Sequence, residues 1–152
     1  MLRGLLIGVV ALLVLVPTAG ASTMTSPESS LLHQMNVVRA EHGLKPLSVD
    51  SRLEQAARFH SHEMLSNDVF EHGAFGTRMA RFRIHGTLAG ENLAWGTGSL
   101  GTAKAVVAAW LASPEHRANL LRPSFRRVGI GELTGSFEGY ADARVVTADF
   151  AG

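Results

Sequence analysis

The chain has 152 residues, contains no cysteine and carries a formal net charge of +1. This length suits one domain, and a chain of this size can bury a sufficient core without disulfides. Arg3 is the only charged residue before residue 22, so residues 22–152 hold 13 basic and 13 acidic residues and have a formal charge of zero. That balance argues against nucleic acid as the main partner, because nucleic acid requires a basic face.

The N-terminus has the pattern of a secretory signal peptide over residues 1–21. Arg3 supplies a positive segment, Leu5 to Val16 is an apolar core, and Ala19-Gly20-Ala21 is a small-residue cleavage site. A retained membrane anchor is the alternative, because the uncharged stretch reaches the short limit of a span, about 20 residues. Pro17 and the cleavage site favour removal. We therefore expect a secreted, extracytoplasmic protein without a stable membrane span.

Two helices are predicted in the first half of the chain. Residues 22–30 form a Ser/Thr-rich lead, expected to be flexible at its start, before a domain over residues 31–152. Within the lead, Ser26-Pro27-Glu28 is a helix-start signal, with a hydroxyl cap, proline at the first position and an acid near the positive dipole end. This first helix ends before Gly43. The second helix is predicted to begin at Asp50 or Ser51 and to end near Asn67.

The remaining elements alternate short helices, loops and strands. We expect a loop over residues 68–76, a short helix over 77–84, a strand over 89–95, a loop over 96–101, an apolar helix over 102–112 and strands over 128–133 and 144–150. Ser113-Pro114 should end the apolar helix and begin a short one that carries Glu115 and His116, because the residue before a proline avoids the helical region. Arg122-Pro123 closes that helix, and a Gly-rich turn region joins the last two strands.

Glu91 lies in a stretch that combines an acid, an amide and a large aromatic residue among apolar side chains. The surroundings indicate burial, and a buried carboxylate is unfavourable unless another group pairs with it. His72 and His116 are the suitable partners, since both lie on segments that can fold back onto this stretch. The sequence alone leaves open that His72 is a loop residue, His116 an anchor and Glu91 a structural acid.

Other histidines do not form a recognisable metal motif. His60 and His62 point to different faces of the predicted helix, so this pair cannot chelate one ion. We expect His60 at the edge of the core and His62 in solvent. His62-Glu63 begins like a zinc-protease helix, but the position of the second histidine is Ser66.

Further motifs have structural interpretations. Ser113 lacks the G-x-S-x-G surroundings of a hydrolase nucleophile and is interpreted as a helix cap. The loop over residues 96–101 lacks the Gly-Lys-Ser/Thr ending of a phosphate-binding loop. Trp95 and Trp110 are expected in the core, together with Leu53, Ala57 and Phe150.

The order of elements and motifs resembles the CAP superfamily, also called the SCP domain, over about residues 31–150. The matching motifs are Asn36-x-x-Arg39, Pro46-Leu47-x-x-Asp50-x-x-Leu53-x-x-x-Ala57, Phe70-Glu71-His72, Gly90-Glu91-Asn92-Leu93-Ala94-Trp95, Trp110-x-x-Ser113-Pro114-x-His116-Arg117-x-Asn119 and Val128-Gly129-Ile130-Gly131. Each motif is a modest signal, and their shared order is a strong one. The cysteine-free SPEHRANLL version is similar to the bacterial branch.

The resemblance implies an α+β fold, a three-layer α-β-α sandwich with a mainly antiparallel central sheet. It also implies a cleft in which His72 and His116 are the metal-site histidines and Glu91 is the first of two glutamates, with Asn92 beside it. The position of the second glutamate is Ser113 in this chain, which leaves the four-residue site incomplete. Glu115 does not automatically replace it.

The chemistry of these side chains is compatible with a divalent cation, zinc first. Two imidazoles with open coordination positions suit zinc, and a nearby carboxylate can orient a ligand histidine or a water molecule. His116 lies in the first turn of a predicted helix, where the positive dipole end favours the neutral imidazole.

Three function classes remain open at this point. The first is a secreted binding module for a divalent ion and a lipid or cell-envelope ligand. The second is a metal-assisted hydrolase acting on peptide or envelope polymer, which needs a general base next to an activated water. The third is a structural interaction domain without a functional metal site. The absence of the second glutamate favours binding over catalysis.

Overall fold

The computed structural model describes residues 24–86 and 88–152. The helices are α1 Ser26–Glu41, α2 Ser51–Asn67, α3 Phe75–Arg81, α4 Ala103–Ala112 and α5 Pro114–Leu120, with a 3-10 helix η1 at Gly98–Gly101. The strands are β1 Ser48–Val49, β2 Ala89–Gly96, β3 Arg127–Phe137 and β4 Tyr140–Ala151. The predicted signal peptide over residues 1–21 lies outside the described residues.

The four strands form one sheet in the order β1-β3-β4-β2, which makes β2 an edge strand. β1 pairs with β3 in parallel, while β2 and β3 both pair with β4 in the antiparallel direction. Glu138 and Gly139 join β3 to β4 with φ values of 50° and 79°, as a tight hairpin turn requires. The free edge of β2 is where loops from both faces of the sheet can meet.

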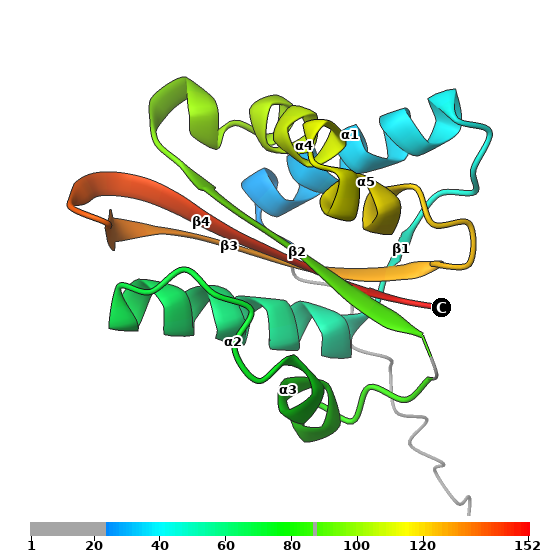
Figure 1. The fold of residues 1–152 in the computed structure, drawn as a ribbon, viewed down its shortest axis with the longest axis horizontal. Helices are drawn as coiled ribbons and strands as arrows, with labels where there is room; N and C mark the ends of the chain where they lie inside the picture. The colour runs from blue at the N-terminus through cyan, green and yellow to red at the C-terminus, as the bar shows by residue number, and fades with distance from the viewer. Residues whose placement is uncertain (1–23, 87) are drawn as a thin grey trace, which may run out of the picture.

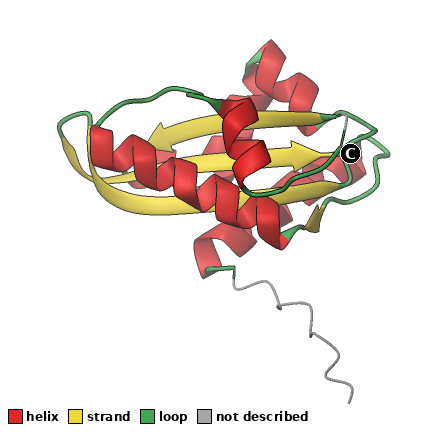
Figure 2. Cartoon of the chain, turned by 90° about the horizontal axis from the view of Figure 1, so that it is seen from below, coloured by secondary structure: helices red, strands yellow, loops and turns green. Residues whose placement is uncertain are grey.

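Helices cover both faces of the sheet. α2 and α3 lie on one face, and α1, α4 and α5 lie on the other (Figure 1). Seen from the α2 side, this long helix runs lengthwise over the sheet, with the shorter α3 beside it (Figure 2). The largest apolar cluster lies between the sheet and the second group of helices and includes Met35, Trp110 and Phe150. The predicted three-layer α-β-α sandwich with a mainly antiparallel sheet is confirmed.

Two glycines of β3 allow α2 to lie directly on the sheet. A Cβ atom at Gly129 would lie 1.9 Å from the carbonyl carbon of Leu53, and one at Gly131 would lie 2.4 Å from a backbone nitrogen of α2. Side chains alternate along a strand, so Val128 and Ile130 point into the main core on the opposite face. The Val-Gly-Ile-Gly motif therefore has a packing explanation.

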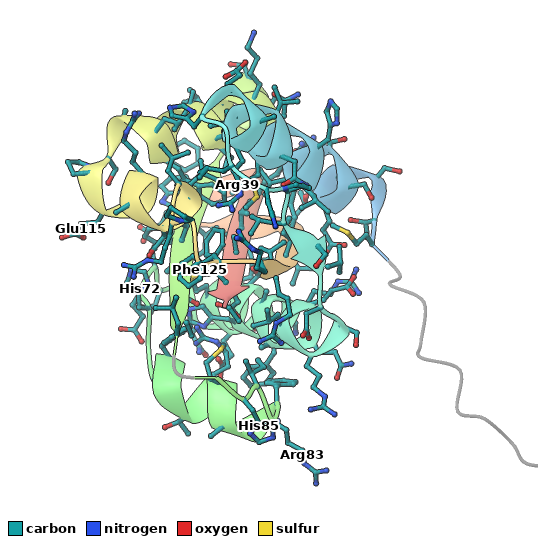
Figure 3. All side chains as sticks on the ribbon, turned by 90° about the vertical axis from the view of Figure 1, so that its right-hand side faces the viewer. Arg39, His72, Arg83, His85, Glu115 and Phe125 are labelled. Atoms are coloured by element: carbon teal, nitrogen blue, oxygen red, sulfur yellow. The ribbon has the colours of Figure 1, made fainter. Side chains whose placement is uncertain are left out.

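Arg39 fixes the helix that carries His116. Its side chain is fully buried, and its guanidinium donates to the backbone carbonyls of Lys45, Leu120 and Phe125 at 2.8–3.1 Å. Arg39 and Phe125 lie inside the molecule (Figure 3). Burial, together with the charge of Arg126, lowers the pKa of Arg39. The carbonyls of Leu120, Arg122 and Phe125 thus tie α1 to the end of α5 and to the loop that follows it.

Some predicted boundaries are wrong. α1 begins at Ser26, where the Ser-Pro-Glu signal predicted a helix start, so residues 26–30 of the lead already belong to the helix. α3 ends at Arg81 rather than at residue 84, and Arg83 has a φ of 54°, which is incompatible with a continuing helix. β3 and β4 extend into the predicted Gly-rich turn region, because a two-residue turn suffices to reverse the chain.

The expected core residues are inside the molecule. Leu53, Ala57, Trp110 and Phe150 are at most 1% exposed, whereas Trp95 is partly exposed and packs edge-on against Phe137 at the far end of the sheet. Across residues 24–86 and 88–152, none of the helices combines the length and the apolar character that crossing a bilayer requires.

We predict that Gly129→Ala destabilises the domain by about 1–3 kcal/mol or more, because the added methyl group overlaps the α2 backbone. Gly76→Ala is the control: a Cβ at this α3 position meets nothing within 4 Å, so the better helix former should be neutral or slightly stabilising. Urea-induced unfolding measures both free energies. Equal stability of Gly129→Ala and wild type would contradict the packing explanation.

Candidate functional site

Edge strand β2 presents Glu91 and Asn92 to opposite faces of the sheet, because successive side chains alternate along a strand. Glu91 is 7% exposed and contacts His72 and Arg78 on the α3 side. Asn92 is fully buried, and its Nδ2 donates to the backbone carbonyl of His116 at 2.9 Å on the α5 side. One pair of neighbouring residues therefore connects the segments that carry both candidate histidines.

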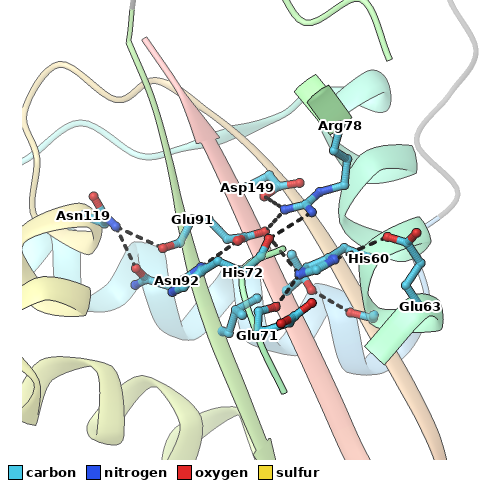
Figure 4. A network of polar contacts seen from close by, with 12 residues as sticks. His60, Glu63, Glu71, His72, Arg78, Glu91, Asn92, Asn119 and Asp149 are labelled. Carbon is cyan, nitrogen blue, oxygen red and sulfur yellow. Dashed lines mark hydrogen bonds and ion pairs between the residues drawn. The ribbon is translucent and has the colours of Figure 1, made fainter. Parts of the chain in front are cut away.

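Both carboxylate oxygens of Glu91 are engaged (Figure 4). Oε1 lies 2.7 Å from Nδ1 of His72, and Oε2 accepts a hydrogen bond from Nη2 of Arg78. The side chains of Glu91 and Arg78 are 3% and 4% exposed, so the ion pair is almost out of water. The structure corrects the expected pairing: the second partner of Glu91 is Arg78 rather than His116. Removing one member of such a buried pair costs about 3–5 kcal/mol, because the other charge is left unpaired.

A second buried acid, Asp149 of β4, lies opposite Glu91 in the strand register. It is fully buried, and within the described structure neither of its carboxylate oxygens has a hydrogen-bond partner. Nη2 of Arg78 is 4.0 Å from Oδ1. Burial, followed by the negative charge of Glu91, raises the pKa of Asp149 well above its usual value against the opposing charge of Arg78. In its protonated form Asp149 can donate to Glu91, which would satisfy this buried group.

Asn119 fixes α5 against β2 on the other face of the sheet. Its Nδ2 donates to the backbone carbonyl of Glu91 at 3.1 Å and to Oδ1 of Asn92 at 3.0 Å. The two asparagines and the carbonyl of His116 form one continuous hydrogen-bonded chain. The position of α5 relative to the strand edge is therefore set by polar contacts from one short segment of β2.

The environment of His116 favours its neutral form. Burial, followed by the positive charge of His72, lowers the pKa of His116, while Glu115 acts in the opposite direction. The neutral, ligand-competent imidazole was expected from the helix dipole, but burial is the larger cause.

Ser113 occupies the junction of two helices. It is the last capping position of α4 and the first of α5, with an extended backbone at φ −96° and ψ 122°. The predicted cap position is correct. Its hydroxyl, however, makes no capping hydrogen bond, so the extended backbone before Pro114 is what separates the helices.

His72 and His116 together offer fewer donors than a complete zinc centre needs. His72 retains Nε2, because Glu91 holds its Nδ1, and His116 supplies a second imidazole. In the part of the chain that the structure describes, no three His, Asp or Glu side chains are grouped so as to hold a metal ion. Zinc sites usually take three or four protein ligands. An ion at this site would therefore depend on water or on a ligand to complete its coordination.

Two residues of the site were not identified from sequence. Asp149 had a usable signal, because it is an acid inside an otherwise apolar strand next to Phe150. Arg78 had none, since it is one of several arginines in a short segment and only the folded chain shows which one reaches Glu91. His60 was expected at the edge of the core and is 3% exposed, while His62 is exposed as predicted.

We predict that Asp149→Asn becomes increasingly stabilising relative to wild type as the pH rises above about 4. The folded protein retains a proton that the unfolded chain releases, so wild-type stability falls as the pH rises from the unfolded pKa toward the raised folded pKa. The slope is at most about 1.4 kcal/mol per pH unit. Urea unfolding between pH 4 and 7 measures the difference, with exposed Asp142→Asn on the same strand as the control. A pH-independent difference would contradict the raised pKa.

Comparison with known proteins gives a consistent picture. The chain is 35% identical over 119 residues to the uncharacterized protein YkwD of Bacillus subtilis, covering 75% of this chain and 45% of YkwD. An extracellular SCP-domain protein from Bacillus anthracis superposes with a TM-score of 0.67 at 27% identity, covering 86% of this chain and 44% of that one. An outer surface protein from Borrelia burgdorferi superposes with a TM-score of 0.62 at 28% identity, covering 78% of this chain and 88% of that one.

The chain spans less than half the length of the curated relatives that it matches, which also include the uncharacterized membrane protein YlbC of Bacillus subtilis. Residues 32–150 match the family described as CAP, the cysteine-rich secretory protein family. This range covers α2, α3, the edge strand with Glu91 and the segment with His116. The chain belongs to the CAP family.

Proposed function

We propose that this chain is an exported binding module, with a weak divalent-cation site at His72 and His116 and a lipid or cell-envelope component as its ligand. The state of Glu91 carries this proposal. A hydrolase needs a carboxylate or imidazole free to take a proton from water. Both oxygens of Glu91 are already engaged, one by His72 and one by Arg78.

The remaining side chains also favour binding over catalysis. Ser113 stands where the family resemblance places a second glutamate, and a hydroxyl offers neither negative charge nor a base. His72 is oriented by Glu91, and His116 is kept neutral mainly by burial. A zinc ion bound to these imidazoles would supply positive charge and an open position for an oxygen of the ligand.

Export is supported by two observations of different kinds. Residues 1–21 have the pattern of a signal peptide. Two of the similar structures are described as an extracellular protein and an outer surface protein. We therefore propose that this domain functions outside the cytoplasm. Because the chain has no cysteine, its core rather than a disulfide must stabilise it there.

We predict that purified protein binds zinc and that His72→Ala and His116→Ala each weaken this binding at least about tenfold. A site with only two protein donors loses half of them in either variant. Affinity should also fall as the pH drops below about 6.5, because protons compete for the same nitrogens. Calorimetric titration measures both effects. His33→Ala, an exposed histidine on α1, is the control. Equal zinc binding by all four proteins would place the ion elsewhere.

We further predict that the zinc-loaded protein does not hydrolyse casein or purified cell-wall polymer faster than the His72→Ala/His116→Ala double mutant. The reason is the lack of a free base beside the two imidazoles. Release of soluble fragments over time is the measurement. Cleavage by the wild type that disappears in the double mutant would establish the hydrolase instead.

A further inference from the structure

A second polar site lies between α2 and α3. Here a pocket of about 220 Å³ has an apolar wall that includes Phe59 and Met64, and a polar wall that includes His60, Glu63 and Glu71. Ligand pockets for drug-sized molecules span roughly 300–1,000 Å³. A pocket smaller than that suits a small molecule or a single side chain of a larger partner.

His60 presents an unused hydrogen-bond acceptor. Its Nε2 lies 2.8 Å from the backbone carbonyl oxygen of Glu71. A carbonyl oxygen can only accept, so Nε2 carries the proton and Nδ1 of the neutral ring is an acceptor. The residue is 3% exposed, and within the described structure Nδ1 has no hydrogen-bond partner. Leaving a buried polar atom without a partner is unfavourable, which indicates that a ligand or water supplies the missing donor.

Glu63 faces the same nitrogen. Its Oε2 lies 3.6 Å from Nδ1 of His60 (Figure 4), which is beyond hydrogen-bond distance. Two acceptors at this separation can be bridged by one group that carries at least two N–H donors. Glu71 borders the same space: a Cβ at Gly73 would lie 3.5 Å from Cε1 of His60 and 3.9 Å from Oε1 of Glu71.

The basic residues of the pocket are engaged by other groups. Arg78 is paired with Glu91 on the sheet side, and the guanidinium of Arg81 lies over the ring of Phe59, 4.2 Å from its centroid. The side chain of Glu63, in contrast, is 45% exposed at the pocket. The arrangement therefore favours a cation over an anion. Because no three His, Asp or Glu groups of the described residues form a metal site, an organic cation fits better than a bare metal ion.

We propose that this pocket binds a primary ammonium group at the end of a short alkyl chain. The ammonium donates to Nδ1 of His60 and to the carboxylate of Glu63, Glu71 adds negative charge, and the alkyl chain packs on Met64. Both a free alkylamine and the side chain of a lysine have this chemistry. This ammonium contacts neither histidine of the cation site proposed at the β2 edge, although Nε2 of His60 lies 4.0 Å from Oε2 of Glu91.

The test is a titration followed by NMR chemical shifts at about pH 7.5, where an unperturbed imidazole is neutral. The probes are n-butylamine and Nα-acetyl-lysine amide, with butyrate and Nα-acetyl-norleucine amide as matched compounds that lack the ammonium. We expect saturable shifts around His60 and Glu63 with both ammonium probes, or with the lysine compound alone if the natural source is a peptide.

The Glu63→Gln/Glu71→Gln double variant should bind at least about tenfold more weakly, because hydrogen bonds to charged groups are stronger than those between neutral groups. It keeps the buried His60 intact, and circular dichroism confirms its fold. Glu41→Gln, an exposed acid on α1, and the His72→Ala/His116→Ala protein should bind like wild type. Absence of saturable binding, equal binding of the norleucine compound, or unchanged affinity of the double variant would each overturn the proposal.

Discussion

A carboxylate buried in an edge strand is the constraint on which the rest of this structure depends. Glu91 is 7% exposed, and an ionised carboxylate in such a place must be paired. Arg78 supplies the charge and His72 a further hydrogen bond. Asp149, on the neighbouring strand, adds a second acid beside the same guanidinium. Only one guanidinium lies beside these two buried acids. Burial and the negative charge of Glu91 therefore raise the pKa of Asp149 against the opposing charge of Arg78.

This pairing determines what the site can do. The Arg78 contact holds α3 against the sheet, and the His72 contact orients one imidazole at the β2 edge. On the opposite face, Asn92 and Asn119 hold the backbone of α5 and with it His116. The groups that build the site thereby contact one another, and each carboxylate oxygen of Glu91 already has a partner in His72 or Arg78. An arrangement of this kind suits recognition better than proton transfer.

Much of the fold follows from local patterns. Helix-start signals and apolar spacing predicted α1, α2 and α4, and the turn at Pro114 predicted α5. The layer order rested on family resemblance, since it depends on contacts between distant segments. Gly129 and Gly131 show the limit of pattern reasoning. The motif was visible in the sequence, but only the folded chain shows that a Cβ at Gly129 would lie 1.9 Å from the α2 backbone.

The candidate site was predicted less completely. The contact between His72 and Glu91 was expected, because both residues lie in recognisable short motifs. The pairing of Arg78 could not be predicted, since any arginine of that region carries the same charge and only tertiary packing selects one. His60 lies at the core, as predicted. Which of its two ring nitrogens lacks a partner could not be predicted, because this depends on the contact between Nε2 and the carbonyl of Glu71.

A double-mutant cycle over Arg78→Gln and Glu91→Gln tests the central role of this ion pair most directly. Urea-induced unfolding at pH 7 of the wild type, both single variants and the double variant gives the coupling free energy. A buried pair of this kind should give a coupling of about 2 kcal/mol or more, because Arg78→Gln leaves Glu91 without its cation and Glu91→Gln leaves Arg78 with only Asp149, at 4.0 Å. A coupling below about 0.5 kcal/mol, the level of an exposed ion pair, would contradict the account.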